Sequence, residues 1–315
     1  MRTWITERFG RDLPLVGAPL AGIGGGRLAA AVSRAGALGM FGAGATATPE
    51  WIAREAAVAG ADGLPYGIGL MAWALAGNPE QVDAVIEARP RLVSVSFGDY
   101  APHVGRLKAA GVTVVTQAGT TREAVAAERA GVDAVVARGG EGGGHGRADV
   151  ATLPLLQSVL EAVEIPVLAA GGIANARGLA AVLAAGAEGA WVGTAFLACE
   201  EAQGSAAAKR RILAAEEDDT AYGRVFDVAQ RLDWPWEYGG RALRNRFFDT
   251  WDGRERELAG DERAQAELAA ARENDDYDTA CLYSGQAVGL VREERPAAAV
   301  VADFAAAGAL LRRWS

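Results

Sequence analysis

The sequence predicts an α/β protein, a (β/α)8 TIM barrel that carries a smaller, mainly helical C-terminal excursion. Short runs rich in β-branched residues alternate with alanine-rich amphipathic runs at a spacing of roughly 25 residues, as βα units do. Eight such units can be counted along the chain. Glycines follow several of the helical runs, where a left-handed C-cap has the lowest steric cost. This repeated order of strand, helix and glycine is typical of a TIM barrel.

Eight strands are expected in the apolar runs that lie between turn residues, each followed by a helical pattern. In chain order the strands are Leu15–Pro19, Leu38–Gly42, Tyr66–Met71, Leu92–Phe97, Val112–Gln117, Ala134–Arg138, Val167–Ala170 and Gly189–Gly193.

The helix boundaries have their own signals. Thr48-Pro49 and Asn78-Pro79 each combine a capping side chain with a proline that fits the first helical position, so both pairs predict helix starts. Helix ends are predicted just before the glycines at positions 36, 111, 131 and 186.

The chain continues beyond the eighth unit with a change of composition. Dense charge and aromatic residues mark positions 201–280, and helical periodicity returns from Pro296 to Trp314. We therefore expect a barrel over residues 1–200, a smaller helical, substrate-side segment over 201–280, and a C-terminal return over 281–315 that packs on the barrel. The middle segment is expected to cover the catalytic face. A structural cap or a subunit interface, and hence a homo-oligomer, stays open because Trp and Tyr are also enriched at interfaces.

Composition excludes several classes of function. The 315 residues are 50% hydrophobic and carry a net charge of −9, which argues against a surface for nucleic acid or for anionic membranes. Two cysteines, Cys199 and Cys281, and two histidines are too few for a disulfide framework or a dense set of metal ligands. The charged N-terminal segment and the lack of a long apolar run predict a cytoplasmic protein without a membrane span.

If the barrel is correct, its chemistry belongs at the C-terminal ends of the strands. Gly171-Gly172 follows the seventh strand, and Gly193-Thr194 follows the eighth. The glycines at these two places expose backbone N–H groups to a common point, which suits a phosphate oxygen, and the Thr194 hydroxyl adds another donor. A tight turn without a ligand is the alternative for Gly171-Gly172.

His145 lies in a long glycine-rich loop after the sixth strand. The loop runs from Gly139 to Ala151, whereas two to six residues are usual for such connections. An imidazole titrates near neutrality, so His145 on the catalytic rim is a candidate proton acceptor. His103, at the start of a predicted helix, is expected to be a surface residue.

Gly22-Ile23-Gly24-Gly25-Gly26 also follows a strand and precedes a helix, as a dinucleotide-binding fingerprint would. The glycine spacing is wrong, and the end of the second strand has no acidic residue to hold a ribose. Close packing of this backbone against a planar ring is the better interpretation.

Four segments together resemble the nitronate monooxygenase family, formerly called 2-nitropropane dioxygenases. They are the glycine- and proline-containing stretch from Pro14 to Gly44, the histidine loop, Ala170–Ile173 and Gly193–Leu197. The resemblance covers roughly residues 12 to 200 and returns at Ser284–Leu290.

The resemblance implies a barrel that holds non-covalent FMN, with its phosphate between Gly172 and Gly193-Thr194. The flavin ring would lie over Pro19, Leu20, Ala21 and Gly22, with His145 as the catalytic base on the substrate side. The remaining cofactor-binding positions that we assign are Gln117, Arg138, Gly143, Gly171 and Trp191.

Three positions depart from the family pattern. Leu20 stands where methionine is frequent, Gly69 replaces a frequent flavin-contacting asparagine, and Arg138 opens the histidine loop where glutamine is common. We expect Arg138 to supply positive charge near the flavin pyrimidine edge or a substrate anion. An ion pair with Glu141 or another carboxylate is the alternative.

The resemblance implies oxidation of nitronates, and of nitroalkanes with His145 as base, by FMN and O2 to a carbonyl compound and nitrite. Two alternatives remain. One is an FMN- and NAD(P)H-dependent enoyl-acyl carrier protein reductase, and the other is a cofactor-free isomerase or lyase that uses the same phosphate-binding pattern. The expected partners are thus small molecules and O2, with no nucleic acid and no membrane.

Overall fold

A computed structural model describes residues 1–313 and contains a closed eight-stranded parallel barrel, which confirms the predicted fold class. Its strands pair in chain order, and the last strand pairs with the first. All begin and end within two residues of the predicted runs: β1 Leu15–Gly17, β2 Leu38–Gly42, β3 Tyr66–Met71, β4 Leu92–Ser96, β5 Thr113–Ala118, β6 Ala134–Arg138, β8 Val167–Ala170 and β9 Ala190–Val192.

Helices occupy the connections between the barrel strands. They are α2 Gly26–Arg34, α3 Pro49–Ala59, α4 Ala72–Leu75, α5 Glu80–Ala88, α6 Ala101–Ala109, α7 Thr121–Arg129, α8 Thr152–Leu160 and α9 Ala176–Ala184. The glycines predicted to follow helices, at positions 36, 111, 131 and 186, all have positive φ. Helices α2, α6, α7 and α9 therefore end as the sequence predicts.

The two predicted helix starts have different outcomes. Thr48 accepts a hydrogen bond from Trp51 N, with Pro49 in the first helical turn, as expected. The cap predicted at Asn78 is wrong, because the Asn78 amide donates to the carbonyl of Ala74 in the preceding turn and α5 begins without a side-chain cap. A short polar side chain can hydrogen-bond to a backbone group that either precedes or follows it in the chain. Asn78 bonds to the preceding Ala74 carbonyl instead of capping α5.

The barrel interior is filled by side chains from most strands, including Val16, Met40, Val136 and Trp191. Helix α1 (Trp4–Phe9) closes the N-terminal end of the barrel, since its Ile5 and Phe9 belong to the same buried cluster. The interior is thus a packed core, which leaves the C-terminal end of the barrel as the open face.

One prediction about the helical ring is wrong. Only a single 3-10 turn, η1 (Thr194–Phe196), follows β9 directly. The place between α9 and α2, where the eighth helix of the ring belongs, is taken by α15 (Ala297–Phe304), which contacts both. The chain therefore leaves the barrel after its eighth strand and supplies the eighth helix only on its return, through η2 (Gln286–Leu290).

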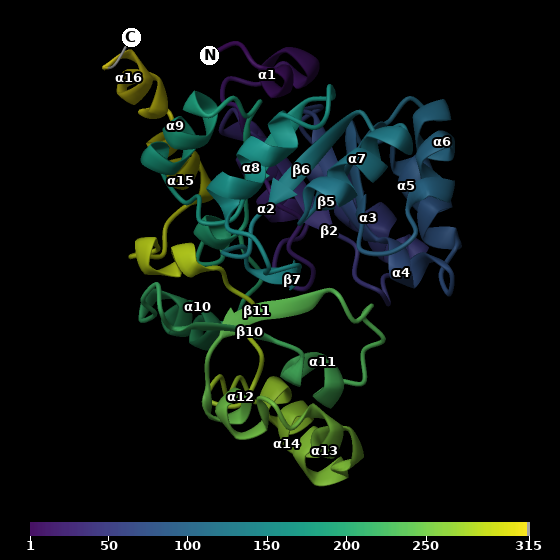
Figure 1. The fold of residues 1–315 in the computed structure, drawn as a ribbon, viewed down its shortest axis with the longest axis vertical. Coiled ribbons are helices and arrows are strands. Elements are labelled where there is room, and N and C mark those ends of the chain that lie inside the picture. The colour runs from purple at the N-terminus through teal and green to yellow at the C-terminus, as the bar shows by residue number, and fades with distance from the viewer. Residues whose placement is uncertain (314–315) are drawn as a thin grey trace.

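The excursion lies over the C-terminal end of the barrel, on the side away from both chain termini (Figure 1). It has a core of its own, formed by side chains such as Phe226, Phe247 and Leu268. Its elements are α10 Ala206–Leu213, β10 Thr220–Gly223, α11 Val225–Ala229, β11 Gly239–Leu243, α12 Arg246–Trp251, α13 Glu255–Gly260 and α14 Glu262–Glu273. Besides the expected helices, it thus contains a pair of strands.

Helix α16 (Ala307–Arg312) packs on α9 at the end of the return segment. Trp314, the last residue of the predicted C-terminal helix, lies outside the described residues. Within residues 1–313, no helix is both long and apolar enough to cross a bilayer.

Candidate active site

A cavity of about 300 Å³ lies at the C-terminal ends of the barrel strands. Every residue that the sequence assigned to the site contributes to its wall except Gly22, which instead takes a φ of +80° in an exposed turn after β1. The assigned residues that line the cavity are Pro19, Leu20, Ala21, Gln117, Arg138, Gly143, His145, Gly171, Gly172, Trp191, Gly193 and Thr194.

The histidine loop is held by a small sheet. Residues Gly144–Gly146 form β7, which pairs antiparallel with β11 of the excursion and places His145 opposite Gly240. The resulting three-stranded sheet has the order β10-β11-β7, and it joins the barrel to the excursion (Figure 1). His145 is therefore fixed by backbone pairing, although its glycine neighbours would leave an isolated loop free to move.

Side chains from both bodies bind the carbonyls of this loop. From the barrel, Arg138 donates hydrogen bonds to the carbonyl oxygens of Gly142, Gly143, Gly144 and Arg147. From the excursion, Arg241 donates to the Gly140 carbonyl and the Tyr222 hydroxyl donates to the Gly146 carbonyl. Since each of these bonds satisfies a carbonyl near the barrel mouth, the loop is preorganised around His145.

Arg138 is a buried cation whose hydrogen-bond partners are neutral carbonyls. Its side chain is 5% exposed, and burial lowers the pKa of its guanidinium to about 10, so it stays charged near neutrality. The direct ion pair with Glu141, the alternative left open by the sequence, does not form, because the Glu141 carboxylate accepts from Thr152 N and Thr152 Oγ1. Arg138 therefore brings positive charge to the cavity wall.

His145 forms a hydrogen-bonded pair with an acid of the excursion. Its Nε2 lies 2.7 Å from Oδ1 of Asp227, and the two side chains are 8% and 2% exposed. The Trp234 ring stacks on the imidazole with 3.6 Å between centroids and 3° between planes. Tyr283 also contacts this pair, because its hydroxyl donates to Asp227 Oδ1 at 3.4 Å. Burial raises the pKa of the Tyr283 phenol well above its usual range. The orientation and hydrogen bonding of the imidazole are thus set by residues from the later part of the chain.

Asp227, Trp234 and Tyr283 were missed from the sequence. One signal could have pointed to Asp227, since it is a single acidic residue within the otherwise apolar run 225–229 and is buried there. A buried carboxylate is rare without a partner, so such a position indicates a pairing. Which residue it pairs with was not readable, because His145 is distant in the sequence.

The glycine turns lie together at one end of the cavity. Gly171 and Gly172 follow β8 with φ of +106° and +71°, values that only glycine adopts at low cost. η1 begins at Thr194, and the first N–H groups of a helical turn have no partner within it. Thr194 Oγ1 accepts a hydrogen bond from Gly285 N at 3.0 Å, which ties the return segment to this turn.

Gly69, which stands where the resemblance implies an asparagine, has no room for a side chain. A Cβ atom at position 69 would lie 2.5 Å from two ring carbons of Pro19. Pro19, which itself lines the cavity, therefore occupies the space that a side chain on Gly69 would need.

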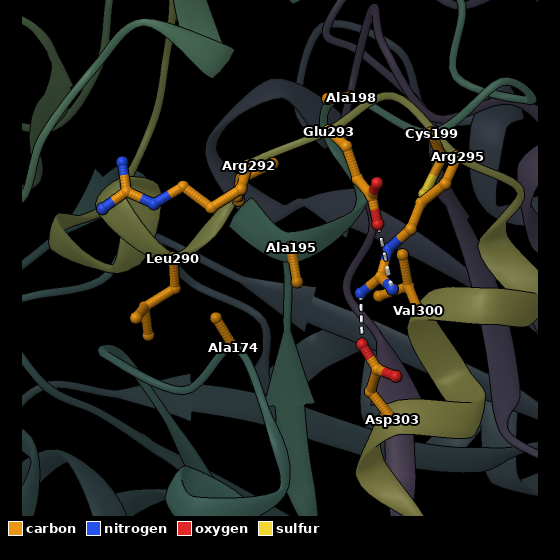
Figure 2. Close-up of a pocket in the computed structure, with 11 residues that line it drawn as sticks. Ala174, Ala195, Ala198, Cys199, Leu290, Arg292, Glu293, Arg295, Val300 and Asp303 are labelled. Atoms are coloured by element: carbon orange, nitrogen blue, oxygen red, sulfur yellow. Dashed lines mark hydrogen bonds and ion pairs between the residues drawn. The ribbon is translucent and has the colours of Figure 1, made fainter.

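A second cavity of about 260 Å³ lies on the other side of η1 and shares no lining residue with the first. Its cationic side chains are already paired. Arg295 contacts Glu293 and Asp303, as Figure 2 shows, while Arg292 makes two contacts of 3.1 Å with Glu216. With its arginines neutralised, this cavity lacks the free charge expected of an anion site, and the first cavity is the candidate active site.

The remaining chemically interesting residues lie elsewhere. His103 is half-exposed on α6, outside the barrel. Cys199 and Cys281 are free thiols, and burial raises the pKa of the Cys199 thiol to about 12. Within residues 1–313, no group of three or more His, Cys, Asp or Glu side chains is arranged to hold a metal ion.

Comparison with known proteins gives several related sequences. A CoA dehydrogenase of Rhodococcus jostii, named for (3aS,4S,5R,7aS)-5-hydroxy-7a-methyl-1-oxo-octahydro-1H-indene-4-carboxyl-CoA, is 39% identical over 72% of this chain. The match spans 64% of that relative's length, which is less than two thirds. A nitronate monooxygenase of Paraburkholderia phytofirmans is 31% identical over 94% of this chain and 92% of its own length.

Two solved structures share the whole architecture. FabK from Thermotoga maritima superimposes with a TM-score of 0.85 at 30% identity, covering 100% of both chains. Nitroalkane oxidase from Streptomyces ansochromogenes gives a TM-score of 0.82 at 32% identity, covering 98% of this chain and 99% of its own. The family model described as nitronate monooxygenase matches residues 71–306, a range that includes the excursion. The chain therefore belongs to the nitronate monooxygenase family of flavin-dependent oxidoreductases.

Proposed function

We propose that the chain is an FMN-dependent enzyme that oxidises nitronates with O2 to a carbonyl compound and nitrite, and that it accepts neutral nitroalkanes through His145. The observation that carries this proposal is the His145–Asp227 pair at the wall of the barrel cavity, 2.7 Å apart and almost fully buried. A histidine oriented by a carboxylate is an arrangement well suited to general-base chemistry.

The cavity residues fit FMN. Gly171-Gly172 and the start of η1 at Thr194 would hold the phosphate, because both expose backbone N–H groups to the same end of the cavity. The Ser284 hydroxyl lines the cavity and is buried without a hydrogen-bond partner, as expected of a group that would hydrogen-bond to a bound ligand. Arg138 adds a positive charge to the wall. When bound, FMN would supply the electron transfer between the nitronate and O2.

The protein's own part is proton abstraction and positioning. Asp227 accepts the hydrogen on Nε2, which leaves the lone pair of the His145 imidazole on Nδ1. Nδ1 would take the α-proton of a neutral nitroalkane and so give the nitronate. Trp234 holds the ring plane by stacking and, with the excursion above it, excludes water from the pair. A nitronate supplied as such needs no base.

The two histidines of the chain provide the test. We expect His145→Asn to lower kcat/KM for a nitroalkane about 10²- to 10⁴-fold and to largely spare kcat/KM for propyl-2-nitronate. His103→Asn, which alters the half-exposed residue on α6, is the matched control and should change neither. Equal losses on both substrates in His145→Asn would count against the base role, and a protein that binds no FMN would remove the proposal.

A second candidate is an FMN- and NAD(P)H-dependent reductase of enoyl thioesters. It is favoured by the 39% identity to a relative whose name specifies a carboxyl-CoA compound. Consumption of NAD(P)H with an enoyl thioester, in a protein inert toward nitronates under air, would make it the better assignment. A cofactor-free isomerase or lyase does not agree with membership of a flavin-dependent family. The cytoplasmic location, O2 as acceptor and a homo-oligomeric state stay predictions.

A further inference from the structure

One side of the cavity is lined by the rings of Phe97 and Trp234. Trp73 and Tyr238 are not part of the cavity lining but pack against these two rings, and we call the four together the aromatic wall. The Trp234 ring centroid lies 5.1 Å from that of Trp73 and 5.5 Å from that of Phe97. The rings of Phe97 and Tyr238 are also 5.5 Å apart. Two of the four come from barrel loops and two from the excursion, so the wall forms only where the two bodies meet.

The aromatic wall lies across the barrel from the glycine turns. Trp73 and Phe97 follow β3 and β4, whereas Gly172 and Gly193 follow β8 and β9. In the closed order β1-β2-β3-β4-β5-β6-β8-β9, these two pairs of strands face each other. A ligand whose phosphate is held at the glycine turns would therefore leave the opposite, aromatic side for the substrate.

The wall is held in place by unusual local structure. Phe97 has a φ of +67°, a conformation that bulky side chains rarely adopt, and its carbonyl accepts from Trp73 N at 3.0 Å. On the excursion side, Arg224 donates to the carbonyls of Trp234, Pro235, Trp236 and Tyr238. Both segments are fixed, so the wall is a preformed surface.

The other side chains that line the cavity from β3 and from the segment before Trp234 are uncharged, namely Leu70, Met71, Gln230 and Leu232. Arg147 and Glu123 contact Tyr238, but neither they nor Tyr238 line the cavity. Among the cavity residues, the charged Arg138 and Glu141 come from β6 and the histidine loop. An anionic head group would thus meet Arg138, while the rest of the molecule would meet apolar surface.

We propose that the aromatic wall selects substrates with an apolar carbon chain and no second charge, and that Trp234 limits their size. This inference rests on the proposed nitronate function. Trp234 covers one face of the His145 ring at 3.6 Å, so a substrate reaches the base only along the space that Trp234 leaves. A larger hydrocarbon chain must displace that ring or stop short of it.

Carboxylates can test the size and charge selection of the aromatic wall by binding alone, without being converted. A carboxylate has the charge and the planar two-oxygen head of a nitronate. Binding of acetate through octanoate to the FMN-loaded protein would be measured by calorimetry. We expect affinity to rise about threefold to fourfold per methylene until the wall is reached and then to level off or fall. Succinate should bind at least tenfold more weakly than butyrate, since its second charge would face apolar surface.

Two tryptophans of one loop give a matched pair of variants. Trp234→Leu should move the plateau to longer chains and raise kcat/KM for long-chain relative to short-chain nitronates. Trp236→Leu removes a ring that is 75% exposed and stacks on Arg224 at 4.8 Å, away from the cavity, so it should leave the series unchanged. Phe97→Leu is the second wall variant if Trp234→Leu fails to fold.

Affinities that do not depend on chain length, equal binding of succinate and butyrate, or the same plateau in the wall variants and the wild type would each overturn the proposal. The binding series also separates the two proposals. A protein that shows the chain-length series but oxidises no nitronate keeps the wall and loses the nitronate function. A protein that oxidises nitronates but shows no chain-length dependence keeps the nitronate function and loses the aromatic-wall proposal.

Discussion

His145 Nε2 and Asp227 Oδ1 are 2.7 Å apart, and this one contact connects the barrel loop with helix α11 of the excursion. The acid's second oxygen, Oδ2, is buried without a hydrogen-bond partner. Asp227 is therefore committed to the histidine and to Tyr283, and its main available role is to fix which imidazole nitrogen carries the hydrogen.

Asp227→Asn should reverse that assignment. The amide can donate to Nε2, which would move the imidazole hydrogen to Nδ1 and remove the lone pair that the proposed base uses. We expect kcat/KM for nitroalkanes to fall at least 10²-fold while nitronate oxidation and FMN content stay near wild type. Nitrogen-15 NMR of the imidazoles measures the tautomer directly, and the His145→Asn variant assigns the signals of the two histidines. An unchanged tautomer with full activity would refute the role, whereas partial rescue in Asp227→Glu would support it.

Arg138→Gln tests the buried charge. An amide can keep part of the hydrogen bonding to the loop carbonyls but not the cation. A unit charge at about 8 Å in a medium of effective dielectric about 20 contributes roughly 2 kcal/mol, so we expect the affinity for a carboxylate or nitronate to fall about 30-fold. Amide hydrogen exchange in residues 139–147 should also become faster, because fewer donors hold the loop. Unchanged anion affinity together with unchanged hydrogen exchange would show that Arg138 neither attracts the anion nor holds the histidine loop.

The buried charge of Arg138 also predicts that the affinity for carboxylates depends on pH. Burial depresses the pKa of Arg138 to about 10, so its positive charge is present near neutrality and is lost as the pH rises through about 10. Carboxylate affinity of the wild-type protein should therefore fall across this range, whereas Arg138→Gln should show no corresponding fall. Calorimetric titrations between pH 8 and roughly pH 11, with folding checked by circular dichroism, would measure it. Parallel profiles in the two proteins would mean that another group is responsible.

Gly172→Ala separates backbone strain from phosphate binding. Its φ of +71° is unfavourable for alanine, and the nearest atom to an added Cβ is 3.7 Å away. We expect a loss of about 1–2 kcal/mol in the free energy of unfolding, together with weaker FMN binding. Gly111→Ala is the control, since Gly111 has a φ of +79° and open space but lies in the loop between α6 and β5, at the opposite, N-terminal end of the barrel. If both variants lost stability and neither lost FMN affinity, the phosphate site would have to be placed elsewhere.

Gly69→Asn restores the residue that the family often has at this position. Because its Cβ would meet the Pro19 ring at 2.5 Å, we expect a loss of about 1–3 kcal/mol in the free energy of unfolding and weaker flavin binding. Gly63→Asn is the control. Gly63 has a φ of +68° and no neighbour within 4 Å of an added Cβ, and asparagine tolerates this backbone conformation. Urea unfolding and FMN titration measure both effects. Tighter FMN binding in Gly69→Asn would show that Pro19 moves easily.

The barrel could be predicted from the sequence because its signals are local. Apolar runs, the cap at Thr48 and the glycines after α2 and α9 each act within a few residues, and the structure confirms them. All the assigned site residues except Gly22 line one cavity, because the ends of parallel strands in a closed barrel must converge. The Asn78 cap failed where two backbone partners competed for one side chain.

The other half of the site depends on tertiary pairing. Asp227 and Trp234 reach His145 only because β7 pairs with β11, and no local pattern specifies that register. The glycine-rich segment 142–146 has little strand propensity of its own. Its strand conformation is supplied by the partner strand and by Arg138 below it, which is why the sequence showed only a long loop.

The position of α15 has a consequence for how the molecule assembles. Residues 297–304 complete the helical ring between α9 and α2, yet they follow the whole excursion in the chain. During synthesis, the eight strands and the excursion emerge before the helix that lies between α9 and α2. Until then, the surfaces of α2 and α9 that contact α15 would be exposed to water. We therefore expect ring closure to be a late, long-range step of folding and nascent chains to be most prone to aggregation just before it.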